Sequence, residues 1–134
     1  QSNNEGEIII LRQYRFAVEQ RILEFPAGTL EKGEDPLSSM QRELAEEAGY
    51  IAHSWEKIGV MLPCPGYSDE IINLFLAQDL EKLEERPPGD EDEDLEVLNM
   101  SEKEFESLVE SGNELLDGKT ITAWFRAKKE LRKK

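Results

Sequence analysis

Cysteine, which forms disulfides, and histidine, which takes part in many nucleophilic sites, are nearly absent from this sequence. There is one cysteine, Cys64, and one histidine, His53. A single cysteine excludes an internal disulfide, which suits a reducing compartment, so we expect a cytoplasmic protein. His53 has no partner pattern for a catalytic triad, and Cys64 has no sign of nucleophile chemistry beyond its place in a loop. We therefore expect neither residue to carry the chemistry.

Basic residues are also scarce. The chain has 16 lysines and arginines against 30 acidic residues, which gives a formal net charge of −14. This balance opposes binding to nucleic acid or to an anionic membrane, and a phosphate substrate would need a bridging cation. No run approaches the roughly 18 apolar residues of a membrane span. The start, Gln1 to Glu7, lacks the basic and then apolar pattern of a signal peptide.

The length of 134 residues predicts a single domain over residues 1–134. Hydrophobic periodicity and turn residues predict strands interrupted by one central helix and followed by two closing helices. The expected strands are Glu7–Arg12, Arg21–Phe25, Ile51–Met61, Glu70–Ala77 and Leu95–Leu98; the expected helices begin at Pro36, Glu102 and about Thr120. This order favours an α/β (α+β) fold, a mixed β-sheet between helices. The turn-forming residues at 2–6 suggest an earlier strand, removed or outside the given sequence.

The helix that begins at Pro36 carries acidic residues in an informative pattern. Asp35 suits its N-cap and Gly49 its C-terminal end, and its apolar stripe comprises Leu37, Met40, Leu44 and Ala48. On an ideal helical wheel centred on Leu44, the acids Glu47, Glu43 and Glu46 lie at about −60°, −100° and −160°. They share one edge, where a cation would relieve their repulsion. Their hard oxygen donors suit Mg²⁺ or Mn²⁺.

An alternative interpretation is that these three glutamates form the solvated face of an acidic helix. The surrounding sequence decides against it. Gly28, Glu34 and the run Arg42–Tyr50 match the pattern G-x5-E-x7-R-E-U-x-E-E-x-G-U, in which U is a bulky apolar residue and Tyr50 takes the last place. Nine specified positions over 23 residues make a chance match improbable. The sequence therefore resembles the Nudix hydrolases through the complete motif of that family.

The resemblance implies a loop–helix–loop that binds metal ions. Glu43 and Glu47, together with Glu46, would be metal ligands, and the Ala27 backbone carbonyl would join them. Arg42 would brace the loop by pairing with a motif glutamate such as Glu34. Gly28 and Gly49 would serve backbone geometry.

A second motif narrows the substrate. The run Cys64-Pro65-Gly66-Tyr67-Ser68-Asp69-Glu70 begins fifteen residues beyond Gly49 and resembles S-P-G-x-[ST]-[DE]-E of the ADP-ribose pyrophosphatase branch. Cys64 departs from the usual serine. By this resemblance, Pro65 marks the substrate loop and Glu70 binds the terminal ribose. The alternative is an ordinary turn before a strand.

Upstream, Arg12-Gln13-Tyr14-Arg15 resembles the R-Q-Y-R strand end of the same branch, where the second arginine approaches the diphosphate. A guanidinium offers paired donors to phosphate oxygens, so Arg15 suits this role. The alternative is a surface arginine. Glu24 is an acid within an apolar strand, so it needs a partner, which an active-site position would supply to this substrate-binding candidate.

The acidic run from Gly89 to Glu96 has two interpretations. Its composition favours a solvated loop, whereas the resemblance implies a catalytic loop with the pattern E-x-E-D-[LI]. On that pattern Glu91 activates water and Glu93 reaches the metal, with a shift of two residues left open.

These features predict Mg²⁺- or Mn²⁺-dependent hydrolysis of a nucleoside diphosphate derivative, with ADP-ribose giving AMP and ribose 5-phosphate. The catalytic set would comprise Glu43, Glu46, Glu47, Arg42 and Glu91. Alternatives are a Nudix hydrolase for another nucleoside diphosphate sugar, a dinucleotide or an oxidised nucleotide, or a Nudix-shaped binding module without catalysis. An acidic calcium buffer lacks EF-hand spacing. The resemblance also implies a homodimer.

Overall fold

The computed structural model describes residues 7–27, 33–85 and 95–132. Its elements follow the predicted order: two strands, a helix, three strands and two closing helices. They are β1 (Glu7–Arg15), β2 (Gln20–Glu24), α1 (Pro36–Glu43), the π-helical turn η1 (Leu44–Ala48), β3 (Tyr50–Met61), β4 (Ile72–Lys82), β5 (Glu96–Ser101), α2 (Glu102–Ser111) and α3 (Gly118–Leu131).

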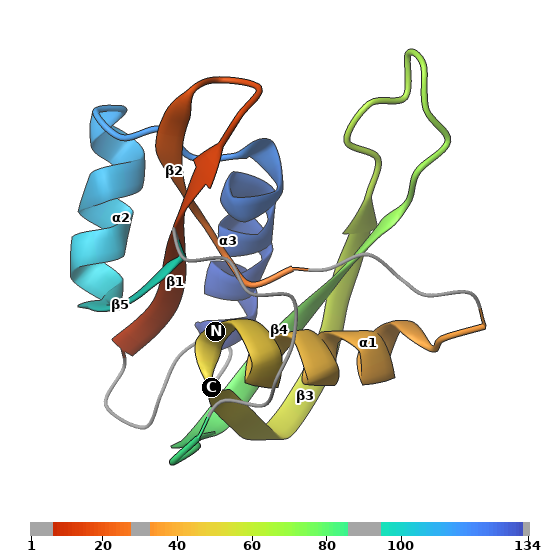
Figure 1. The fold of residues 1–134 in the computed structure, drawn as a ribbon, viewed down its shortest axis with the longest axis vertical. Helices are drawn as coiled ribbons and strands as arrows, with labels where there is room; N and C mark the ends of the chain where they lie inside the picture. Colours follow the sequence, from red (N-terminus) through yellow and green to blue (C-terminus); the bar gives the residue numbers. More distant parts are fainter. Residues whose placement is uncertain (1–6, 28–32, 86–94, 133–134) are drawn as a thin grey trace.

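Strand β1 is the centre of the fold. It pairs antiparallel with β2 on one edge and with β5 on the other. Its apolar run Ile8–Leu11 is at most 2% exposed. Side chains alternate along a strand, and here Ile8 and Ile10 pack with residues of α2 and α3, whereas Ile9 and Leu11 pack with residues of η1. A strand buried on both faces explains the unbroken apolar run, and it confirms the predicted sheet between helices (Figure 1).

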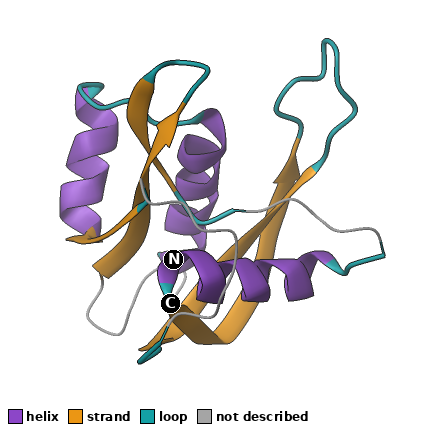
Figure 2. Ribbon diagram, in the orientation of Figure 1, coloured by secondary structure: helices purple, strands orange, loops and turns teal. Residues whose placement is uncertain are grey.

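Strands β3 and β4 form a second, two-stranded antiparallel ladder (Figure 2). The α/β class is confirmed, but the described strands lie in two antiparallel sheets where a single mixed sheet was expected. The parallel pairing found among these residues is an isolated bridge between Leu23 and Leu116. Within the described chain, β1 has a partner on each edge, and β4 pairs with β3 alone.

The predicted ends of the first helix are confirmed. The Asp35 carboxylate accepts a hydrogen bond from the Ser38 backbone N–H at 3.1 Å, and Gly49 closes the helix with φ of 76°, a left-handed conformation that glycine adopts without strain. The ideal helix of the prediction is not continued to Gly49, because Leu44–Ala48 form a π-helical turn. Apolar spacing over so few residues does not distinguish the two hydrogen-bond patterns.

The apolar stripe of this helix is buried unequally. Leu44 and Ala48 lie in the core with β1, whereas Leu37 and Met40 are half-buried. All five strands differ from prediction at one or both ends: for example, β1 ends at Arg15 rather than Arg12, β4 spans Ile72–Lys82 rather than Glu70–Ala77, and β2 ends at Glu24 rather than Phe25.

The two closing helices cover one face of β1. A capping box formed by Ser101 and Glu104 begins α2. Helix α3 begins earlier than predicted, because the Asp117 side chain accepts from the Thr120 backbone N–H and acts as N-cap. Phe105 of α2 lies between the rings of Phe25 and Trp124, with centroid distances of 5.3 and 5.1 Å. None of the helices in the described residues is long and apolar enough to cross a membrane.

Phe105 offers a test of this packing. It is fully buried, so Phe105→Ala should lower the free energy of unfolding by about 3–5 kcal/mol through lost burial and a cavity. The matched control is Phe125→Ala on α3, where the side chain is 68% exposed. That control should change stability by no more than about 0.5 kcal/mol. Urea denaturation of the two variants measures both, and equal effects would contradict the packing described.

Candidate active site

Arg42 of α1 forms hydrogen bonds with three glutamates, Glu34, Glu43 and Glu46. We call α1 and η1, which carry Glu43, Glu46 and Glu47, the carboxylate helix. Nε and Nη2 of Arg42 donate to the two carboxylate oxygens of Glu34 at 3.2 and 3.0 Å. Its Nη1 donates to Glu43 at 2.8 Å and to Glu46 at 3.4 Å. The structure thus brings Arg42 and Glu34 together as expected, and the guanidinium also holds two of the three predicted metal ligands.

Glu47 has a different environment. Its Oε1 accepts a hydrogen bond from the Ala27 backbone N–H at 3.0 Å. Burial raises the pKa of Glu47 to about 7, against the lowering effect of the Ala27 bond, and the nearby carboxylates of Glu43 and Glu24 raise it further. Burial also raises the pKa of Glu43, opposed by Arg42. Burial is thus the main cause of the raised pKa at both carboxyls, and neighbouring carboxylates add to it.

A ready-made metal site is not present in the described part of the chain, where no three histidine, cysteine or acidic side chains are gathered closely enough to hold an ion. The geometry gives a reason: Glu43 and Glu46 are drawn to Arg42, whereas Glu47 is bonded to Ala27. The donor chemistry nevertheless suits a hard divalent cation, because all three predicted ligands are carboxylates.

Arg15 and Glu24 form a two-pronged ion pair. Nε and Nη2 of Arg15 each lie 2.8 Å from a carboxylate oxygen of Glu24. Glu24 is only 3% exposed, so the expectation that this acid needs a partner is confirmed. The bond to Glu24 raises the pKa of Arg15. The pair leaves about half of the Arg15 side chain exposed and rigidly oriented.

Three further residues, at the start of α3, were missed by the sequence analysis. The Lys119 ammonium group lies 3.8 Å from Glu24 and also pairs with Asp117. The Thr120 hydroxyl accepts from the Phe25 backbone N–H at 2.9 Å and donates to Asp117. The spacing of Asp117 and Thr120 is an N-cap signal that could have placed the helix start correctly. The contacts of Lys119 with Glu24 and of Thr120 with Phe25 join segments that are distant in the sequence, so no local sequence pattern predicts them.

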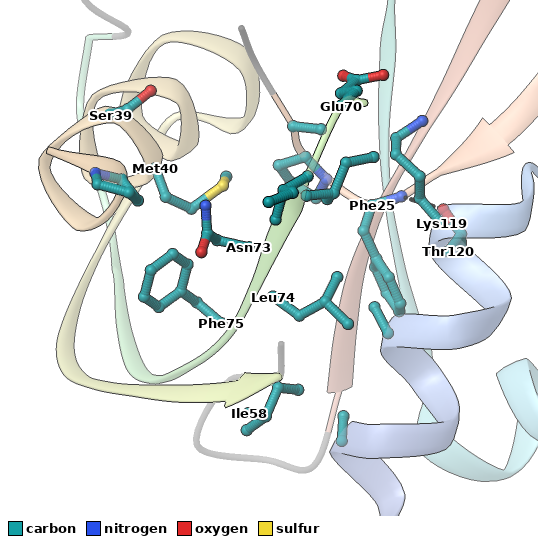
Figure 3. Close-up of a pocket in the computed structure, with 17 residues that line it drawn as sticks. Phe25, Ser39, Met40, Ile58, Glu70, Asn73, Leu74, Phe75, Lys119 and Thr120 are labelled. Carbon is teal, nitrogen blue, oxygen red and sulfur yellow. Dashed lines mark hydrogen bonds between the residues drawn. The ribbon is translucent and has the colours of Figure 1, made fainter. Parts of the chain in front are cut away.

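A cavity of about 300 Å³ lies beside these groups (Figure 3). Ala27, the hydrogen-bond partner of Glu47, forms part of its wall. Glu70 and Lys119 also line it, together with apolar side chains from α1, β3, β4 and α3. Pro65 does not line this cavity; it is exposed in a turn in which the Cys64 carbonyl accepts from the Tyr67 and Ser68 N–H groups.

Some predicted site residues lie outside the described part of the chain. These are Gly28 of the first motif and both residues assigned to the acidic loop, Glu91 and Glu93. Of the predicted residues that are described, Arg15, Glu24, Ala27 and Glu43 all interact with Glu47, whereas Pro65 does not line the cavity.

Fold and site together define a class of protein: an α/β domain in which a helix with arginine-braced carboxylates lies beside the Arg15–Glu24 ion pair and a small cavity. The chain belongs to the Nudix family, since the model of the NUDIX domain matches residues 1–125.

Particular relatives are similar over most of the chain. It is 46% identical over 120 residues to the ADP-ribose pyrophosphatase of Bacillus subtilis (strain 168), with 90% of this chain and 64% of that protein covered. It is 39% identical, with the same coverage, to the methanol dehydrogenase activator of Bacillus methanolicus. The GDP-mannose pyrophosphatase of Citrobacter koseri (strain ATCC BAA-895 / CDC 4225-83 / SGSC4696) is 30% identical over 85% of this chain and 62% of its own length.

A crystal structure of an ADP compounds hydrolase has a similar fold. The two structures align with a TM-score of 0.83 at 27% identity, over 96% of this chain and 68% of the other. The chain thus spans about 64% of the length of the first two of these curated relatives.

The pKa of Glu47 predicts how stability depends on pH in the absence of metal. Because this pKa is raised from 4.5 to about 7, the folded protein keeps a proton that the unfolded chain loses. This contribution to stability is therefore complete below pH 4.5 and is lost as pH rises through about 7. Glu47→Gln cannot lose a proton, so its stability should lack this decline.

Between pH 4.5 and 8, the wild type should lose on the order of 2 kcal/mol relative to Glu47→Gln. Urea denaturation at several pH values, with a chelator present, measures the free energy of unfolding of both proteins. The contributions of titratable groups that both proteins share cancel in the difference between them. The exposed control Glu110→Gln should follow the wild type. Parallel pH profiles for wild type and Glu47→Gln would contradict the burial described for this carboxyl.

Proposed function

We propose that the protein hydrolyses the diphosphate bond of a nucleoside diphosphate derivative, with ADP-ribose as substrate and AMP and ribose 5-phosphate as products. The observation that carries the proposal is the set Glu43, Glu46 and Glu47 next to Arg15 and the cavity. The similarity to an ADP-ribose pyrophosphatase over 90% of the chain supports the choice of substrate.

The cofactor in this proposal is Mg²⁺, with Mn²⁺ as a substitute, because hard carboxylate oxygens prefer such ions. Nudix hydrolases are in general dependent on divalent metals. Glu43, Glu46 and Glu47 would hold the ion, with the Ala27 carbonyl and Glu93 as further donors. The bound ion would offset charge on the diphosphate and help to activate water. It also allows a protein with a net charge of −14 to bind an anion.

Arg15 binds the diphosphate in this proposal. Its bonds to Glu24 use Nε and Nη2, so Nη1 and the exposed part of the guanidinium can donate to phosphate oxygens. Glu24 fixes the orientation of Arg15, which lowers the entropy lost on binding. Arg42 holds Glu43 and Glu46 in place.

The remaining roles follow the family motifs. Glu70, which lines the cavity, binds the terminal ribose, and the loop that contains Pro65 borders the substrate. Glu91 takes a proton from the attacking water. A carboxylate is a suitable general base when it lies within hydrogen-bond reach of that water.

A second candidate function keeps the reaction and changes the substrate. The chain is also 30% identical to a GDP-mannose pyrophosphatase, so a nucleoside diphosphate hexose is the main competitor. A binding module without catalysis is less favoured, because simple binding does not require three carboxylates along one helix, whose repulsion disfavours the fold.

Glu47→Gln tests the proposal. With ADP-ribose and Mg²⁺, turnover should fall at least about tenfold, equivalent to about 1.4 kcal/mol of transition-state stabilisation, because one metal ligand is lost. AMP release by the wild type, Glu47→Gln and the exposed control Glu110→Gln measures the effect. The control should keep wild-type turnover. A smaller loss in Glu47→Gln would refute the metal role of this residue.

The same assay decides the substrate. ADP-ribose, GDP-mannose, a dinucleotide and an oxidised nucleoside triphosphate are compared by kcat/KM for the wild type. A higher value for any of the other three compounds would replace ADP-ribose, and no hydrolysis of any compound with Mg²⁺ or Mn²⁺ would favour the binding module.

A further inference from the structure

The segment before α3 lies against β2 and brings a second cation to Glu24. The Leu23 N–H donates to the Leu115 carbonyl at 3.0 Å, and Leu23 forms a parallel bridge with Leu116. The chain that leads into α3 therefore runs beside the end of β2. Helix α3 begins directly afterwards, and its Lys119 ammonium group lies 3.8 Å from Oε1 of Glu24.

Glu24 is thus shared by two cations. Its Oε1, the oxygen closest to Lys119, also accepts from Nη2 of Arg15 at 2.8 Å, and its Oε2 accepts from Nε of Arg15 at 2.8 Å. The Glu24 side chain is 5% exposed, whereas those of Arg15 and Lys119 are 48% and 33% exposed. One buried negative charge therefore lies between two positive charges that both reach the surface.

Asp117 also pairs with Lys119, but α3 itself holds most of this carboxylate. Asp117 is the N-cap: its Oδ1 accepts from the Thr120 backbone N–H at 3.2 Å and from the Thr120 hydroxyl. The N-terminal end of a helix carries a partial positive charge, which offsets a carboxylate placed there. The Lys119 ammonium bonds to the other oxygen, Oδ2. Asp117 therefore takes up only part of the Lys119 charge, and Glu24 receives the rest.

The second cation changes what Arg15 can do. Glu24 occupies two N–H groups of the guanidinium and orients it. An arginine paired with one carboxylate is neutral as a group, so it attracts an anion only weakly. Lys119 acts on the same carboxylate and restores a positive charge to the group. It does so from α3, on the far side of Glu24, and leaves the exposed N–H groups of Arg15 available.

We propose that Lys119 is a positioning residue: it compensates the charge of Glu24, so that Glu24 can orient Arg15 without cancelling the attraction of Arg15 for the diphosphate. The inference rests on the proposed function and deepens it. Lys119 acts through Glu24 and not by touching the phosphates, so its effect on binding depends on Glu24. Direct contact with the substrate is the competing role, because Lys119 also lines the cavity.

A double-mutant cycle on ADP binding separates the two roles. Titration calorimetry with Mg²⁺ uses ADP, which has the diphosphate and no terminal sugar. Lys119→Met alone should weaken ADP binding by about tenfold. In the Glu24→Gln background the same substitution should change the affinity by no more than about twofold. Lys129→Met, at an exposed position of the same helix, is the matched control and should leave ADP affinity unchanged.

Two further variants distinguish positioning from a structural role in the helix cap. Lys119→Arg keeps the positive charge, so its ADP affinity should stay within about threefold of the wild type. Asp117→Asn keeps a capping side chain and removes a competing negative charge, so it should bind ADP at least as tightly as the wild type. Circular dichroism establishes that each variant is folded.

Four results would overturn the proposal. The first is a tenfold loss from Lys119→Met that persists in the Glu24→Gln background, since Lys119 would then contact the phosphates itself. The second is unchanged ADP affinity in folded Lys119→Met. The third is equal weakening by Lys119→Arg and Lys119→Met, or weakening by Asp117→Asn, which would indicate a role in the cap alone. The fourth is a wild type that does not bind ADP.

The AMP-release assay separates this inference from the proposed function. In an active enzyme, Lys119→Met should raise KM for ADP-ribose about tenfold and change kcat by no more than about twofold, because Arg15 binds the diphosphate in the ground state and the transition state alike. Hydrolysis of ADP-ribose without coupling between Lys119 and Glu24 would keep the function and reject the positioning role. Coupled ADP binding without hydrolysis would reject the function and keep the positioning role.

Discussion

The segment from Glu24 to Ala27 must satisfy its buried polar groups as it leaves β2, and each does so with a different element. Glu24 pairs with Arg15 of β1. The Phe25 N–H donates to Thr120 of α3, and the Ala27 N–H donates to Glu47 of η1. Buried groups without partners are costly, so this segment fixes two helices and a strand relative to one another. The candidate site exists because those elements meet there.

The electrostatics of the site follow from the same arrangement. Arg42 supplies one positive charge for Glu34, Glu43 and Glu46. Glu47 accepts a hydrogen bond from the Ala27 backbone amide. The nearest positive charge that acts on it belongs to Arg15, which is itself bonded to Glu24. The described cations therefore offset only part of the acidic charge. A protonated Glu47 near neutral pH and a bound cation are two ways to relieve the same excess of charge.

Local chemistry explains which elements could be predicted from the sequence. Asp35, Pro36 and Gly49 determine the ends of a helix through groups a few residues away. The apolar run Ile8–Leu11 required a strand covered on both faces, which the structure has. Such features depend on neighbours along the chain, and they were placed correctly.

The features that were not predicted depend on contacts between distant segments. The division into two sheets depends on pairings between distant segments, such as β1 with β5, which leave no local signal. Lys119 enters the site only because α3 packs against the end of β2, and its own sequence context shows an ordinary helix start. The π-helical turn also escaped prediction, since the spacing of Leu44 and Ala48 suits both helix types. The Nudix motif predicted the composition of the site, but not the orientation of Glu47 toward Ala27.

Ala27 joins the wall of the cavity to the carboxylate of Glu47. One face of the residue lines the cavity, and its N–H holds Glu47. A ligand that shifts this backbone would change the position and the solvation of the Glu47 carboxylate together, because burial is the main cause of its raised pKa. The segment is held on its other side by Thr120, which limits such a shift. The cavity wall and the Glu47 carboxylate thus share one backbone segment, and Thr120 and Glu47 hold that segment from two different elements.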